Sequence, residues 1–270
     1  MSDHRLSGYV EVWWRAIDDL TTLLEQVAGE DWATPTDLPG WDVHAVVAHT
    51  AHLEALLAGA DHDQVDIGEP AHVRGPMGQF TEQGVVARRD RTPDELINEI
   101  RSSATTRHTA LLADPPTDPD APAPSVYGLI GWTTERLLRN RPLDVWMHEQ
   151  DVRRALDRPG NLDGPAAAHT ADYLAESLGF VVGKRLGAPV GTTVVLEVSG
   201  HAAYAVEVGA DGRARTLTEP PAEPTTRMAM DRGSFVLLAG GRRAPEPGAV
   251  RVAGDAALAQ QVLDHLAVTP

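Results

Sequence analysis

The sequence of 270 residues contains no cysteine. This absence excludes disulfide bonds, thiolate ligands for a metal ion and a protein thiol that acts as a nucleophile. Any thiol chemistry carried out by this protein would therefore need a thiol supplied by a second molecule.

Positive charge and long apolar runs are also scarce. The 39 acidic residues outnumber the 23 basic ones and give a formal net charge of −16, so nucleic acid and anionic membrane surfaces would be repelled. The first residues, Met1–Leu6, contain no apolar core of a signal peptide, and no stretch approaches the roughly 18 apolar residues that span a bilayer. We therefore expect a cytoplasmic protein whose partners are small molecules, with no nucleic-acid or membrane partner.

The first half of the chain repeats apolar residues at the helical period. Stripes over residues 6–29, 43–59 and 92–111 predict three amphipathic helices, and the third begins with a Thr-Pro-Asp-Glu capping box. A fourth helical region spans 126–156, where Pro142 is expected to start or kink the second half. This pattern predicts a four-helix bundle.

Residues 61–91 interrupt this pattern. They are polar, contain several glycines and show little periodicity, which predicts a long loop with at most one short helix near residues 79–88. Loops of this length often cover active sites.

The periodicity changes in the second half of the chain. One further helix is predicted over residues 165–186, and β-branched or alternating residues then favour short strands. The predicted strands and the closing helix cover 192–198, 204–208, 228–230, 250–252 and 256–266. We expect an α+β fold in two domains, a helical bundle over residues 1–160 and a smaller sheet domain over residues 161–270.

Three polar residues lie where the helical pattern predicts buried faces. His49 falls in the apolar stripe of residues 43–59, while Asp144 and His148, four positions apart, share one face of the fourth helical region. Two imidazoles and a carboxylate that converge between helices would hold a metal ion and leave it an open position, as in catalytic sites.

Each of these residues also has a structural interpretation. His49 can instead be a core histidine that is hydrogen-bonded to a backbone carbonyl. His52, one turn along, is the alternative ligand from the same helix. Asp144 and His148 can form a simple surface ion pair. The spacing alone is weak evidence, because about one or two acid–histidine pairs four apart are expected by chance in this composition.

A second pair with this spacing is Glu197 and His201, but it straddles a predicted strand and a turn. Residues four apart need not share a face there.

The residues around the pair on the fourth region suggest supporting contacts. Asp151, three positions after His148, is placed to orient a ligand or to pair with Arg154. Glu149 and Arg153 are expected to lie in solvent.

Two segments resemble the mycothiol-dependent maleylpyruvate isomerase family. They are Pro39-Gly40-Trp41 followed by His49, and Asp144–Leu156 with the sequence DVWMHEQDVRRAL. The resemblance extends more faintly to residues 239–243 and 252–255. It implies a DinB-like four-helix fold for the N-terminal domain and a C-terminal α+β domain similar to sterol-carrier modules.

The resemblance also implies a site. In this family a divalent metal, typically zinc, is held by a histidine from the second helix and by a glutamate and a histidine four apart on a later helix. His49, Asp144 and His148 occupy the matching positions, and Asp144 stands where the characterised isomerases have glutamate. An arginine of the C-terminal domain helps to hold the anionic substrate or thiol in the family, and Arg242 is the match in this chain.

The function implied is that of a metal-dependent isomerase or thiol S-transferase that uses mycothiol, held as a metal-bound thiolate, against a small electrophile. Two alternatives stay open at this level, a zinc-dependent hydrolase on the same bundle and a non-catalytic binding or stress protein. The ligand types also permit non-haem iron. The sequence is compatible with a monomer or a homodimer.

Overall fold

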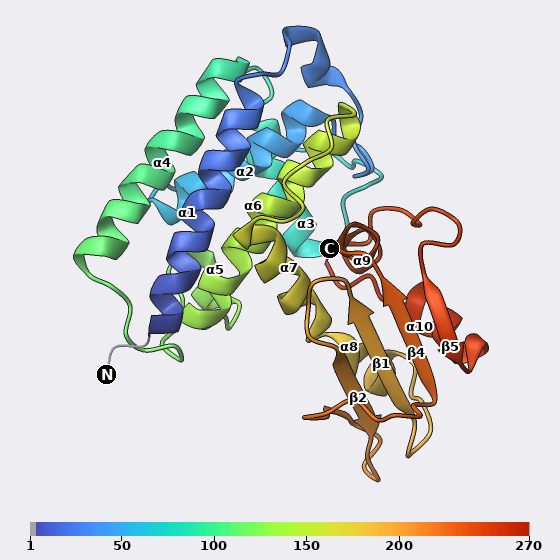
Figure 1. Cartoon of the computed structure of the whole chain (residues 1–270). Coiled ribbons are helices and arrows are strands. Elements are labelled where there is room, and N and C mark those ends of the chain that lie inside the picture. Colours follow the sequence, from blue (N-terminus) through green and yellow to red (C-terminus); the bar gives the residue numbers. More distant parts are fainter. Residues whose placement is uncertain (1–3, 270) are drawn as a thin grey trace. The chain divides into compact units, whose positions relative to one another are not determined.

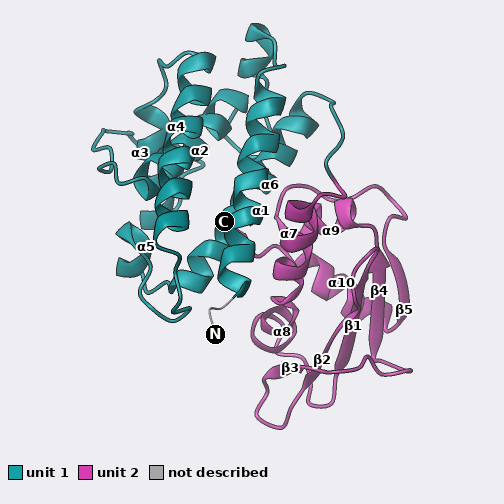
Figure 2. Cartoon of the chain, turned by 60° about the vertical axis from the view of Figure 1, so that its left-hand side comes forward, with its two compact units in different colours: residues 1–161 teal, residues 162–270 magenta. Residues whose placement is uncertain are grey.

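The computed structural model describes residues 4–269. The chain divides into two compact units, residues 1–161 and residues 162–270 (Figure 2). The first unit is helical and the second contains a five-stranded mixed sheet. The α+β fold that the sequence predicted is therefore confirmed.

Four long helices form the first unit. They are α1 (His4–Leu24), α2 (Val43–Leu57), α4 (Pro93–Ala113) and α6 (Thr134–Ala155). Helix α1 packs against α6 and α4, and α2 packs against α4 and α6 (Figure 1). The core between them consists of large apolar side chains that are at most 5% exposed, including Leu6, Trp13, Leu20, Val46, Leu96, Ile100, Leu137 and Trp146.

Side-chain caps determine where three of these helices begin. The carboxylate of Asp42 accepts a hydrogen bond from the Ala45 amide at 2.8 Å at the start of α2, and Thr133 caps α6 in the same way. At α4 the capping box predicted from the sequence is confirmed, with reciprocal hydrogen bonds between Thr92 and Glu95. Each cap satisfies backbone N–H groups that the first helical turn leaves without partners.

Two boundaries in this unit differ from the sequence prediction. Helix α3 (Gly75–Val86) is longer than the short helix expected near residues 79–88 and begins earlier in the segment. Helix α6 continues through Pro142 without interruption, so this proline does not start a new helix. An interior proline costs about 3 kcal/mol, and the buried side chains on both sides of Pro142 outweigh that cost.

The helical region predicted over residues 126–156 is interrupted before α6 and not at Pro142. The short helix α5 (Ser125–Leu129) precedes α6, and Gly131 adopts a positive φ of 79° between them. The remaining short element of this unit is the 3₁₀ turn η1 (Gly29–Ala33), which follows α1.

The second unit begins with a broken helical segment where one helix was expected over residues 165–186. The structure has α7 (Pro165–Ala175), the short α8 (Leu178–Phe180) and a π-helical turn, η2 (Val181–Arg185). A side chain at Gly183 would lie 2.6 Å from the backbone nitrogen of Ala214. The glycine therefore allows this segment to approach strand β3 (Ala214–Thr216) closely.

The sheet has the strand order β3-β2-β1-β4-β5, and only β1 and β4 pair in parallel. Its strands and the two helices that accompany them are β1 (Thr193–Val198), β2 (Tyr204–Val208), β3 (Ala214–Thr216), β4 (Thr226–Met230), α9 (Arg232–Ala239), β5 (Arg251–Gly254) and α10 (Ala256–Asp264). Strand β3 and helix α9 were not predicted, because each is too short to show a clear period. Within residues 4–269, no helix combines the length and the apolar character needed to cross a bilayer.

Replacing Thr92 by alanine is expected to lower the free energy of unfolding by about 1 kcal/mol, because α4 loses its side-chain cap. Chemical denaturation measures this change. The matched control is Thr109→Ala at an exposed position of the same helix, where alanine's higher helix propensity predicts no loss. Equal destabilisation by both substitutions would show that the capping box contributes nothing specific.

Candidate metal centre

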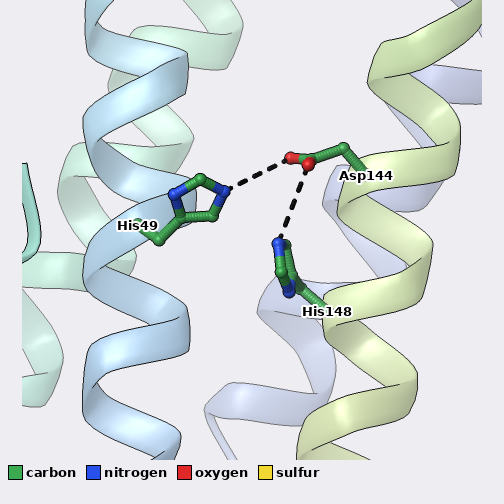
Figure 3. Close-up of side chains that lie close together, drawn as sticks. All are labelled: His49, Asp144 and His148. Carbon is green, nitrogen blue, oxygen red and sulfur yellow. Dashed lines mark ion pairs between the residues drawn. The ribbon is translucent and has the colours of Figure 1, made fainter. Parts of the chain in front are cut away.

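Three polar side chains meet between α2 and α6. His49 projects from α2, while Asp144 and His148 lie one turn apart on α6 (Figure 3). Nε2 of His49 lies 3.8 Å from Oδ2 of Asp144, and Nε2 of His148 lies 3.7 Å from Oδ1 of the same carboxylate. One ligand atom from each residue lies within 4.8 Å of the other two.

These separations fit a divalent metal ion. In a tetrahedral zinc site with bonds of about 2.1 Å, ligand atoms lie about 3.4 Å apart. The three atoms are therefore wider apart than in a loaded site by an amount that side-chain rotation can close. The donor set is two nitrogen ligands and one oxygen ligand, which leaves a fourth tetrahedral position for another molecule.

The surroundings favour the protonation states that bind metal. The side chains of His49 and His148 are each 8% exposed, and that of Asp144 is 21% exposed. Burial lowers the pKa of His49. Burial raises the pKa of Asp144, but the charge of Arg141 and the two histidines outweighs it and holds that pKa well below its usual range. A neutral imidazole and an ionised carboxylate are the forms that coordinate a cation.

His148 is oriented by a fully buried carboxylate. Its Nδ1 lies 3.1 Å from Oδ2 of Asp151, which leaves Nε2 directed toward Asp144. Asp151 in turn accepts from Arg154, whose Nε donates to Asp37 at 2.7 Å. Both contacts predicted for Asp151 are confirmed, and an acid–histidine pair of this kind usually supports a metal ligand.

His49 is held differently, by packing. Within the described residues its Nδ1 is buried and has no hydrogen-bond partner. The indole ring of Trp41 lies against it, with ring centroids 5.1 Å apart, and also lies 6.3 Å from the ring of His148. Trp41 is therefore a wall of the site.

Helix α3 fixes that wall. Nε1 of Trp41 donates to Oε2 of Glu82 at 2.9 Å, and Nε2 of His72 lies 3.1 Å from the same oxygen. The segment predicted as a covering loop thus contributes a buried carboxylate next to the site. Sequence reasoning missed Glu82, since nothing in its spacing connects it with Trp41.

A second missed group is the arginine that contacts the candidate ligand. Nη1 of Arg141 donates to Oδ2 of Asp144 at 2.8 Å, and the same guanidinium binds Glu54 of α2. The available signal was a charged residue three positions before Asp144 in a helix with a buried face.

Other predicted residues lie elsewhere. His52, the alternative ligand, is not a member of the group, and its Nε2 lies 3.1 Å from Nδ1 of His62. Burial, with the charge of Arg88, lowers the pKa of His52 to about 3. Glu149 was expected in solvent but is fully buried, and its ion pair with Arg153 compensates the charge. That expectation was wrong because α6 is covered on more than one side.

The C-terminal candidate belongs to the second unit. Nη1 of Arg242 donates to the carbonyl oxygen of Gly240 at 2.6 Å and to Oγ1 of Thr269 at 3.3 Å. The competing pair Glu197 and His201 does not form, since Glu197 binds Arg227 and His201 binds Asp172.

Comparison with known proteins shows the family of this chain. The model of the mycothiol maleylpyruvate isomerase N-terminal domain matches residues 13–153. The chain belongs to the mycothiol maleylpyruvate isomerase family. The model of that family's C-terminal domain matches residues 168–261, so the two models cover most of both units.

Individual relatives add fold information. Two uncharacterized proteins of Mycobacterium tuberculosis, from strains CDC 1551 and H37Rv, are each 27% identical over 164 residues, a match that covers 58% of this chain and 62% of theirs. A crystal structure of the mycothiol-dependent maleylpyruvate isomerase, and one of its variant with a histidine replaced by alanine, align with a TM-score of 0.55. Each covers 94% of this chain and 95% of the isomerase at 17% identity, which shows a common fold.

Replacing Asp151 by asparagine is expected to weaken zinc binding by about 10- to 100-fold, because the acceptor that orients His148 loses its charge. Competition with a chromophoric chelator measures the affinity. Asp172→Asn is the control, since Asp172 binds His201 in the second unit. Unchanged affinity in Asp151→Asn would show that packing alone orients His148.

Proposed function

We propose that this protein is a metal-dependent enzyme that uses mycothiol to isomerise a small electrophile of the maleylpyruvate type. The observation that carries the proposal is the convergence of His49, Asp144 and His148 between α2 and α6. Family membership supports the same reaction.

The three side chains have distinct tasks in this proposal. Two neutral imidazoles and one carboxylate would hold a divalent cation, most simply zinc, and leave one position open. A cation held there supplies a positive charge that keeps an incoming thiol deprotonated at neutral pH. The chain has no cysteine, so the thiol must come from another molecule, and we propose mycothiol because of the family to which the chain belongs.

In this proposal the bonds that form and break are those of the thiol and the electrophile. The thiolate adds to a carbon–carbon double bond conjugated to a carbonyl, and the former double bond becomes a single bond that rotates. Loss of the same thiolate restores the double bond in the other geometry, so atoms and electrons balance without an oxidant. A transferase would stop at the adduct. The ring of Trp41 lies against the imidazoles of His49 and His148 and would limit the access of water to this step.

We also propose a role for the second domain, taken as residues 161–270. Arg242 is the candidate partner for an anionic group of the substrate or of the thiol, and the support for it is the family resemblance. Arg242→Ala is expected to raise the KM for the anionic substrate and to leave the zinc content unchanged. Steady-state kinetics with metal analysis checks this, and an unchanged KM would rule out this role for Arg242.

The central test combines metal content with thiol binding. Wild-type protein is expected to purify with about one zinc per chain and His148→Ala with far less, because one of three ligands is lost. His44→Ala is the matched control on α2, since His44 bonds to the Arg91 carbonyl outside the group. Equal, negligible metal in wild type and His148→Ala would end the enzymatic proposal.

Thiol binding separates the isomerase from a hydrolase. Mycothiol at 100 times its Kd should stabilise the zinc form by about 2.7 kcal/mol through mass action, seen as a raised Tm that the metal-free protein does not show. Conversion of maleylpyruvate in the presence of mycothiol completes the test. A zinc form that millimolar mycothiol does not stabilise would favour the hydrolase.

A further inference from the structure

A buried ion pair joins the two helices that carry the candidate ligands. Glu54 of α2 is fully buried and Arg141 of α6 is 1% exposed. Nε and Nη2 of Arg141 donate to Oε1 of Glu54 at 3.2 and 2.6 Å. Such a pair requires many partners to offset the loss of hydration.

Helix α1 fixes the glutamate in this pair. Nε1 of Trp13 donates to Oε1 of Glu54 at 3.1 Å. A second arginine, Arg107 of α4, brings Nη1 to 3.8 Å from Oε2 and stacks its guanidinium over the ring of Trp13. All four long helices therefore meet at Glu54.

The Glu54–Arg141 pair also contacts the candidate metal site, through Asp144. Glu54 lies five positions after His49 on α2, and Arg141 lies three before Asp144 on α6. The third guanidinium nitrogen, Nη1, donates to Oδ2 of Asp144 at 2.8 Å. One planar group thus binds two carboxylates from different helices, which the single ammonium of a lysine does not reproduce.

We infer that Arg141, anchored by Glu54, is a positioning residue that sets the orientation of Asp144 as a metal ligand and keeps α2 and α6 in register at the site. Its guanidinium donates to Oδ2, the oxygen that also faces His49, and Oδ1 faces His148. A carboxylate held in this way would present one oxygen toward each histidine and so toward an ion bound between them. The inference rests on the proposed function and specifies how its site is held.

A substitution that removes the charge of Arg141 distinguishes a positioning role from a purely electrostatic effect on the metal ion. Two negative groups, Glu54 and Asp144, balance the two positive groups Arg141 and Arg107. Removing the positive charge of Arg141 would strengthen cation binding if only long-range charge mattered. Removing it should weaken binding if the guanidinium positions the ligand. The two explanations therefore predict opposite signs for one substitution.

The test compares zinc affinity in full-length wild type, Arg141→Met and Arg141→Lys. Chelator competition should show zinc binding weakened by about 10- to 100-fold in both variants, and the cobalt form should show an altered visible spectrum. The matched control is Arg88→Met, because Arg88 is a buried arginine that likewise bridges two carboxylates, Asp63 and Glu99. It should lose stability while its zinc affinity stays within about threefold of wild type.

Three results would overturn the inference. Arg141→Met that binds zinc as tightly as wild type, or more tightly, shows that Arg141 does not position the ligand. A loss of affinity in Arg88→Met as large as that in Arg141→Met shows that general destabilisation is the cause. Wild type that binds no zinc ends the proposed function and this inference with it, whereas the first two results leave the proposed function intact.

If the Arg141 variants do not fold, Glu54→Gln provides the second measurement. Glutamine keeps the shape and the acceptor for Trp13 but loses the charge that holds Arg141. Zinc affinity is expected to fall although Glu54 contacts none of the three ligands. Wild-type affinity and an unchanged cobalt spectrum in Glu54→Gln would overturn the inference.

Discussion

Burial of charge between α2 and α6 is the constraint on which the rest of this structure depends. Glu54 and Asp151 have fully buried side chains, and that of Asp144 is 21% exposed. An unpaired carboxylate in such a place is strongly unfavourable, so each needs a cation or several hydrogen bonds. Two arginines of α6 donate these hydrogen bonds. Arg141 binds the carboxylates of Glu54 and Asp144, and Arg154 binds that of Asp151.

This network leaves the site with a clear electrostatic character. The arginines neutralise the buried carboxylates, while the carboxylate of Asp144 presents Oδ2 to Nε2 of His49 and Oδ1 to Nε2 of His148. The bundle therefore positions the site from all four long helices, and in the proposed reaction the chemistry would come from molecules that the site binds. This division suits a fold whose proposed reaction relies on a thiol from outside the chain.

The segment between α2 and α4 extends the same principle to the wall of the site. Glu82 of α3 binds the indole of Trp41, and Trp41 packs on both imidazole rings. A side chain at Gly84 would lie 2.0 Å from the ring of His52, so glycine lets α3 approach α2 closely. The segment predicted as a long loop with at most one short helix thus contains a packed helix, whose contact with Trp41 joins residues far apart in the sequence.

The sequence by itself determined the elements whose signal is local. Apolar stripes identified the four long helices, the Thr92–Glu95 box marked a helix start, and alternation identified most strands, because these features depend on neighbours a few positions apart. The three residues that converge were singled out for the same reason. Only the tertiary structure decided that Arg141 bridges Glu54 and Asp144, that Glu82 fixes Trp41 and that α6 continues through Pro142. These outcomes depend on which distant side chains share a buried space, and no sequence period encodes that.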